Sequence, residues 1–339
     1  MTGDGLVGKL GRFLTKVVAP AVPAFKTADL LVAVVAVTAD SRLFGGLFGA
    51  WIQLPSEWVP HAAKALGLGN PDDVSAALAQ TSEDEGEGLR EAAIKKKAQR
   101  DYSESARLFS RAASAFAAAG TEITAFEAAN AHSEAAKCYG VLKQVEYARK
   151  ANLESAVIYE RYEKSWVRAA AIYEKVGNEE RERGDLIGAL GYLDKALALY
   201  RNTGDGRAYH VDTMRVDLLS TLGRYGDAIA LYEVLSAHAV TVPTLKFSVR
   251  SFLSNALFCT LALQDQAALQ RSLTRYVDEY PLFADVEPAW RMLVQAWIAG
   301  DAEFFEMAEQ KVRMLNTVAK GSWQDQSIAL VKESLTSLC

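Results

Sequence analysis

A short apolar pattern recurs along the middle of this sequence. Small residues are followed by a tyrosine in four segments: residues 156–160 (AVIYE), 170–174 (AAIYE), 196–200 (ALALY) and 228–233 (AIALYE). A small residue lets a neighbouring helix come close, and the aromatic ring fills the groove that is left. A helical pair of this kind cannot bury its apolar face alone. The pattern therefore predicts stacked helical hairpins, although the spacing between its copies is irregular.

Residues 224–263 are the clearest example of such a hairpin. Apolar side chains recur at helical spacing in residues 227–239 and again in residues 245–263, and Pro243 separates the two helices. Lys246 and Arg250 stand four residues apart, which predicts that they share one helix face beside the second apolar stripe. We expect the apolar faces to pack on neighbouring hairpins and the cationic face to remain free.

The same periodicity predicts about a dozen helices between residues 89 and 338. Proline is scarce, with 8 residues, and alanine is abundant, which favours an all-α fold. The predicted architecture is a right-handed, tetratricopeptide-like α-solenoid over residues 83–280, followed by a C-terminal helical bundle over residues 281–339. The acidic run at residues 82–88 (SEDEGEG) predicts a solvated linker in front of this solenoid.

Residues 1–82 differ in pattern from the rest of the chain and form a separate N-terminal extension. Residues 6–18 predict a basic amphipathic helix, which fits either a membrane interface or the protein's own core. The longest apolar run, at residues 30–37, is too short to span a bilayer.

Residues 42–52 (RLFGGLFGAWI) place large apolar side chains among glycines. The glycines remove any strong fold preference, and Trp and Phe gain from the membrane interface. We favour shallow membrane contact over a loop that is tucked into a pocket. The membrane-contacting candidates are Phe44, Leu47, Phe48 and Trp51.

Charge and cysteine content exclude several classes of protein. The formal net charge is −5, so bulk charge does not favour nucleic-acid binding. Cys138 and Cys259 lie in apolar stripes, and the odd count of three cysteines fits a reducing compartment. The four histidines have no metal-ligand spacing, no phosphate loop is found, and no catalytic constellation can be recognised without the fold. We expect no metal, no cofactor and no enzymatic activity.

The sequence from Tyr102 to Leu338 resembles a known family, the soluble NSF attachment proteins, which are the adaptors of SNARE disassembly. The best matches are residues 232–265 (YEVLSAHAVTVPTLKFSVRSFLSNALFCTLALQD) and 275–297 (RYVDEYPLFADVEPAWRMLVQAW). Family members similarly have an LLKYSAK-like stretch before an apolar helix, and then a YEELFPAFSDSRE-like corner.

The resemblance implies a non-enzymatic adaptor for vesicle trafficking and membrane fusion. Such an adaptor binds the acidic SNARE four-helix bundle through a basic concave face. Its C-terminal cap, here residues 281–339, recruits and stimulates the hexameric AAA ATPase NSF. The resemblance also implies a cytoplasmic protein that is held peripherally on vesicles or endomembranes, with no cofactor.

The family's functional residues can be carried over by position. Those implied to bind SNAREs are Lys164, Arg168, Arg215, Lys246 and Arg250. The penultimate leucine that stimulates the ATPase matches Leu338, and its acidic flank is reduced to Glu333. The family's membrane loop is FFSGLFG-like, and residues 43–49 (LFGGLFG) look like it, although they lie farther upstream. A basic residue of the family's corner aligns with Glu287.

Two alternatives remain open at this point. Each basic residue could simply belong to a solvated helix face. The chain as a whole could be a tetratricopeptide-type scaffold or co-chaperone that binds peptide tails, which would have no need of Leu338.

Overall fold

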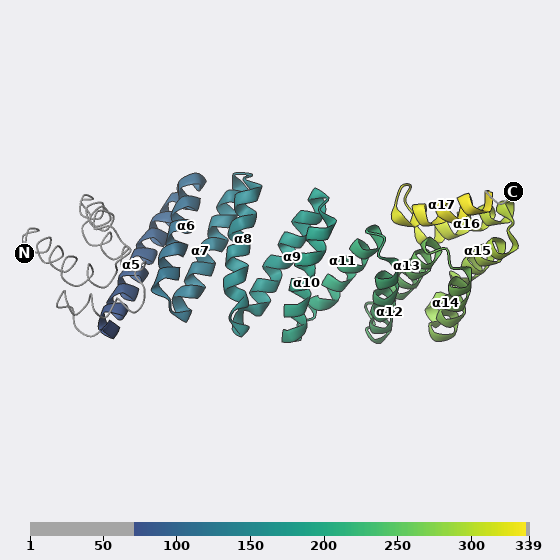
Figure 1. Ribbon diagram of the computed structural model, residues 1–339, viewed down its shortest axis with the longest axis horizontal. Helices are drawn as coiled ribbons and strands as arrows, with labels where there is room; N and C mark the ends of the chain where they lie inside the picture. Colours follow the sequence, from purple (N-terminus) through teal and green to yellow (C-terminus); the bar gives the residue numbers. More distant parts are fainter. Residues whose placement is uncertain (1–70, 337–339) are drawn as a thin grey trace, which may run out of the picture. The chain divides into compact units, whose positions relative to one another are not determined.

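The structure, a computed structural model, describes residues 71–336. Within this range the chain is helical and contains no strand. Two 3-10 turns, η2 (Glu163–Ser165) and η3 (Pro281–Phe283), accompany the α-helices (Figure 1). The α-helices are α5 (Pro71–Ala98), α6 (Tyr102–Ala119), α7 (Glu122–Val141), α8 (Val145–Glu160), α9 (Trp166–Arg183), α10 (Leu186–Thr203), α11 (Arg207–Thr221), α12 (Tyr225–Thr241), α13 (Ser248–Ala262), α14 (Gln266–Glu279), α15 (Glu287–Ala299), α16 (Ala302–Asn316) and α17 (Trp323–Thr336).

The predicted all-α solenoid is confirmed, and successive helices pack as antiparallel hairpins. Between α10 and α11, Arg201 lies 2.7 Å from Asp212, whereas the earlier Asp194 lies 2.6 Å from the later Arg215. This crossing order requires the two helices to run in opposite directions. Next-but-one helices consequently run in the same direction, as in a stack of hairpins.

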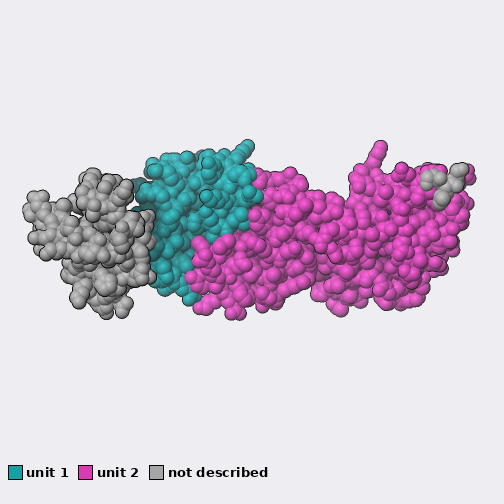
Figure 2. All heavy atoms as spheres, viewed as in Figure 1, with its two compact units in different colours: residues 1–155 teal, residues 156–339 magenta. Residues whose placement is uncertain are grey.

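The chain divides into two compact units after Ser155 (Figure 2). In the first unit, α5, α6 and α7 pack around small buried residues such as Ala93 and Ala106, together with Phe109. In the second unit, α9 to α13 form consecutive hairpins, and α13 also packs against α17. The predicted boundaries after residues 82 and 280 stay predictions, and the first of them falls inside α5.

The recurring small-and-aromatic pattern forms the core, as predicted. The first alanine of each segment is fully buried, and the four tyrosines, Tyr159, Tyr173, Tyr200 and Tyr232, are at most 3% exposed. Cys138 and Cys259 are buried as well. Aromatic rings of this size contribute much of the apolar area that holds successive helices together.

A tyrosine–glutamate dipeptide adds polar links between the helices. The Tyr173 hydroxyl donates to Glu160 (2.7 Å) and the Tyr200 hydroxyl donates to Glu174 (2.9 Å). Each of these glutamates follows a core tyrosine of an earlier helix. Burial, together with the bond to Glu160, raises the pKa of Tyr173, so its hydroxyl stays protonated and donates.

Glycine–aspartate pairs end one helix and begin the next. Gly184 and Gly300 take positive φ values of 87° and 67°, which an L side chain rarely adopts. The carboxylates of the following Asp185 and Asp301 accept hydrogen bonds from backbone N–H groups of the next first turn. These pairs explain how turns as short as two residues can join long helices.

The prediction of a solvated linker at residues 82–88 is wrong, because these residues lie in the middle of α5. Gly86 is buried against α6, and a Cβ atom at this position would lie 2.7 Å from the Phe116 ring. The glycine is therefore a point of close helix contact and not a break in the chain. Asp84 and Glu85 are exposed, so their carboxylates do not oppose the burial of Gly86.

Candidate interaction surface

The turns that join α8 to α9, α10 to α11 and α12 to α13 lie on one edge of the second unit. They share this edge because α9, α11 and α13 run in the same direction and each begins there. The opposite edge carries the α9–α10 and α11–α12 turns. A feature that repeats at the start of these three helices is therefore repeated in space, one hairpin after another.

Four of the five predicted SNARE-binding residues lie at this edge. Lys164 is exposed in η2, and Arg168 is exposed in the first turn of α9, 5.8 Å from the Tyr159 ring. Lys246 is exposed in the turn before α13, and Arg250 is exposed in its first turn. We name these four residues the cationic edge.

The geometry predicted for Lys246 and Arg250 is wrong in one respect. They do not share a helix face, because α13 begins at Ser248. Around Pro243 the backbone makes two successive four-residue turns, in which Leu245 N–H donates to the Val242 carbonyl and Ser248 N–H donates to the Leu245 carbonyl. Lys246 precedes the first residue of α13 by two positions and Arg250 follows it by two, so both side chains lie at the edge where α13 begins.

The cation of the middle hairpin is paired with an acidic side chain. Arg207 begins α11, but its guanidinium binds Asp205 at 2.8 Å and lies 4.6 Å from the Tyr200 ring. The hydrogen bond from Arg207 lowers the pKa of Asp205 to about 2, so the carboxylate is charged at neutral pH and offsets the cation. Arg250 also has an acidic neighbour, Asp285, at 3.8 Å, but both side chains are largely exposed, so this longer contact is weak.

Arg215, the fifth predicted residue, has internal partners. Its guanidinium lies 2.6 Å from Asp194 of α10 and 2.9 Å from Asp212 of α11, and its side chain is only 20% exposed. This arrangement ties α10 to α11. It also leaves Arg215 less exposed to an outside partner than the four residues of the cationic edge, whose side chains are all exposed.

The groove between α9 and α11 is lined mainly by polar and acidic side chains. A hollow of about 550 Å³ is bordered by Glu174, Glu179 and Glu182, with Lys175 and Arg207 beside them. Glu174 also accepts the hydrogen bond from Tyr200. An acidic rod would be repelled by these carboxylates, so the cations that could hold it lie at the edge and not inside this groove.

The remaining predicted residues lie at the ends of the chain. Glu333 is exposed on α17, while Leu338 lies outside the described residues. The membrane candidates Phe44, Leu47, Phe48 and Trp51 also lie outside them. No helix between residues 71 and 336 is both long and apolar enough to cross a bilayer. Within the same range no group of His, Cys, Asp and Glu side chains could hold a metal ion.

Sequence reasoning overlooked two features of this surface. The acceptor glutamates Glu160 and Glu174 were treated only as neighbours of core tyrosines, although the repeated YE dipeptide was visible. Phe247 was not singled out, yet its ring is 75% exposed and lies 5.1 Å from the Lys246 ammonium group. An exposed ring beside a cation offers apolar contact next to charge.

The sequence of this chain is similar to those of known vesicular-fusion proteins. The sequence model described as "Soluble NSF attachment protein, SNAP" matches residues 70–335. A probable vesicular-fusion protein of Schizosaccharomyces pombe is 27% identical over 212 residues, which are 62% of this chain and 72% of that protein. A probable vesicular-fusion protein of Neurospora crassa is 24% identical over 167 residues, 49% of this chain and 55% of its own length. A vesicular-fusion protein of Coprinopsis cinerea is 33% identical over 63 residues, which are 19% of this chain and 22% of that protein.

Proposed function

Since the chain belongs to the soluble NSF attachment protein family, we propose that it is a non-enzymatic adaptor in vesicle fusion, which binds SNARE four-helix bundles and recruits an NSF-type AAA ATPase. The observation that carries this proposal is the cationic edge. Lys164 and Arg168 are exposed at the start of one hairpin, and Lys246 and Arg250 at the start of another, on the same side of a helical stack.

The mechanism that we propose is electrostatic and geometric. A rigid stack presents side-chain cations at intervals of whole hairpins, and a rod-shaped bundle presents carboxylates along its length. An exposed ion pair contributes on the order of 0.2–1 kcal/mol, so a single contact is too weak to hold the partner. Several contacts, and several copies of the adaptor, are needed for stable binding. Such binding weakens as salt rises, because exposed charges are screened.

Reversing two charges of the cationic edge tests this proposal. Lys246→Glu with Arg250→Glu is expected to weaken binding to assembled SNARE bundles by about ten- to a hundredfold at low salt, since two attractions become repulsions. Pull-down or titration at low and high salt measures the effect. The matched control is Arg183→Glu with Arg224→Glu, which changes net charge equally at the opposite edge.

The control variant is expected to bind like the wild type. Equal losses in both variants, or no loss in the first, would refute a role for the cationic edge.

Removal of Leu338 and Cys339 separates the proposed adaptor from a peptide-binding scaffold. For the adaptor, bundle binding persists while stimulation of the ATPase falls, whereas a scaffold has no dependence on Leu338.

We further propose that the N-terminal extension tethers the adaptor to membranes. Phe44, Leu47, Phe48 and Trp51 supply large apolar side chains of the kind that bind at a bilayer interface. Phe44→Ser with Phe48→Ser is expected to abolish flotation of the chain with liposomes. Unchanged flotation would mean that these two side chains serve the protein's own interior, and circular dichroism would then check that the variant remains helical.

A further inference from the structure

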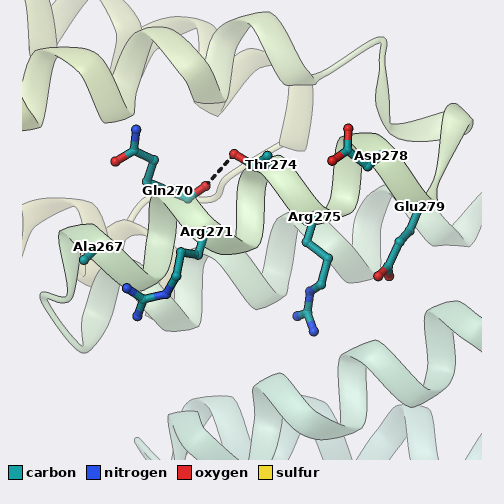
Figure 3. Close-up of a pocket in the computed structure, with 7 residues that line it drawn as sticks. All are labelled: Ala267, Gln270, Arg271, Thr274, Arg275, Asp278 and Glu279. Atoms are coloured by element: carbon teal, nitrogen blue, oxygen red, sulfur yellow. Dashed lines mark hydrogen bonds between the residues drawn. The ribbon is translucent and has the colours of Figure 1, made fainter.

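Helix α14 carries a row of exposed charged side chains on one side. Arg271, Arg275 and Glu279 follow one another at intervals of four residues, and they point the same way from the helix (Figure 3). They border an open hollow of about 550 Å³ along the helix. Read along the chain, the row presents two positive groups and then one negative group.

Helix α5 carries the complementary row at the same spacing. Glu87, Glu91 and Lys95 are exposed at intervals of four residues, so they follow one side of that helix. Glu91 and Lys95 form no ion pair with any residue between 79 and 336, and Glu87 has only a contact of 3.6 Å with Arg90. This row presents two negative groups and then one positive group.

We propose that α5 of one copy of this chain docks beside α14 of a second copy, with the two helices parallel. In that register Glu87 meets Arg271, Glu91 meets Arg275 and Lys95 meets Glu279. An antiparallel arrangement would place Lys95 against Arg271 and Glu87 against Glu279, which is repulsive at both ends. The charge order therefore selects the direction as well as the partner.

Arg275 already contacts Glu233 of α12, but this does not prevent a second pairing. A guanidinium group has five N–H donors, and two other arginines of this chain each hold two carboxylates. Arg215 binds Asp194 and Asp212, and Arg313 binds both Glu309 and Asp325. Arg275 can bind Glu233 of its own chain and Glu91 of the neighbouring copy in the same manner.

An exposed aliphatic side chain adjoins the row on α5. Ile94, which precedes Lys95 and follows Glu91 by three residues, is 53% exposed. Its burial in the contact would add an apolar term to the charge pairs.

The contact joins two different surfaces, so any open assembly has one free α5 and one free α14 at its ends. Three exposed ion pairs are weak by themselves, and the contact is therefore favoured when a common partner holds the copies close together. The inference therefore rests on the proposed function: a SNARE bundle that binds several adaptors would hold α5 of one copy near α14 of the next, and the contact would strengthen the binding of both copies.

Cross-linking between two differently tagged preparations tests the contact. Both carry Cys339→Ser; the first adds Gly88→Cys on α5, and the second adds Gln270→Cys on α14. In the parallel register Glu87 faces Arg271. Position 88 follows Glu87 and position 270 precedes Arg271, so both introduced cysteines lie on the same side of the helix pair. A short bis-maleimide links the chains, first with concentrated free protein at low salt and then with assembled SNARE bundles. The first arm needs no bundle, so it is independent of the proposed function.

We expect a heterodimeric product, and a drop of about fivefold or more when Arg271→Glu and Arg275→Glu are introduced in the second preparation. Glu87→Arg with Glu91→Arg in the first preparation should have the same effect. Mixing the two reversed preparations should restore the product. The matched control, Arg291→Glu on α15, should leave the yield unchanged. Absence of the product in both arms, or failure of the charge swap to restore it, would overturn the proposal.

Discussion

Replacing Trp290 with alanine is expected to lower the free energy of unfolding by about 3–5 kcal/mol, because a large buried ring would be removed from a site that cannot collapse around the space. Trp290 is 0% exposed, and its ring lies 4.7 Å from that of Phe258 in an edge-to-face arrangement. Its indole Nε1–H donates to the Ser254 hydroxyl at 3.4 Å. The substitution would therefore remove both apolar contact and a buried hydrogen bond.

The effect should spread through the C-terminal part of the second unit. Phe258 of α13 also contacts Trp323, at the start of α17, with ring centroids 6.4 Å apart. Trp323 in turn lies 6.4 Å from the Tyr225 ring of α12. Loss of the Trp290 ring removes this aromatic contact between Phe258 and α15, and so loosens a cluster that joins four helices.

Urea denaturation followed by circular dichroism measures the loss of stability, and hydrogen exchange read by mass spectrometry locates it. Faster exchange is expected in α13, α15 and α17, with no change in α6. The control is Ile298→Ala on the same helix; its side chain is 51% exposed, and a change within about 0.5 kcal/mol is expected. A similar loss from both variants would show that Trp290 has no special role in the core.

The helical fold could be predicted from the sequence because burial repeats with the helix period. The small-and-aromatic segments identified the core tyrosines correctly, since a small residue and a ring at helical spacing have few other uses. Helix ends were less certain because they depend on single residues. The start of α13 was placed before Lys246, whereas two four-residue turns around Pro243 delay it to Ser248.

Tertiary contact also overrode local composition in α5. An acidic run with two glycines has the composition of a linker, and nothing local distinguishes it from one. The helix continues through it because Gly86 allows close approach to Phe116, a residue that lies one helix further along the chain. A pattern confined to seven residues cannot contain that information.

The ion pairs of the candidate site also depend on contacts between residues far apart in the sequence, which a local pattern does not contain. Exposed cations can be proposed from sequence, but their partners depend on the register between helices. Arg215 lies 2.6 Å from Asp194, which is 21 residues earlier in the chain. That pairing follows from the packing of α10 on α11, and family position alone gave no sign of it.

Arg215 therefore supplies a prediction in which a structural and a functional role give different results. Arg215→Met is expected to lower the free energy of unfolding by about 2–4 kcal/mol. Asp212 is only 7% exposed and would keep Arg201 as its remaining partner, while Asp194 would lose its tie to α11. Methionine keeps much of the side-chain volume, so the loss would report the charge and its hydrogen bonds more than the packing.

Two comparisons decide between these roles. Arg224→Met removes an arginine whose side chain is 55% exposed and pairs with an equally exposed Asp227, so a change within about 0.5 kcal/mol is expected. At a temperature where it remains folded, Arg215→Met should bind SNARE bundles far better than the Lys246→Glu, Arg250→Glu variant. If Arg215→Met instead keeps full stability and loses bundle binding, its guanidinium contacts the partner directly. The link between α10 and α11 would then be dispensable in the free protein.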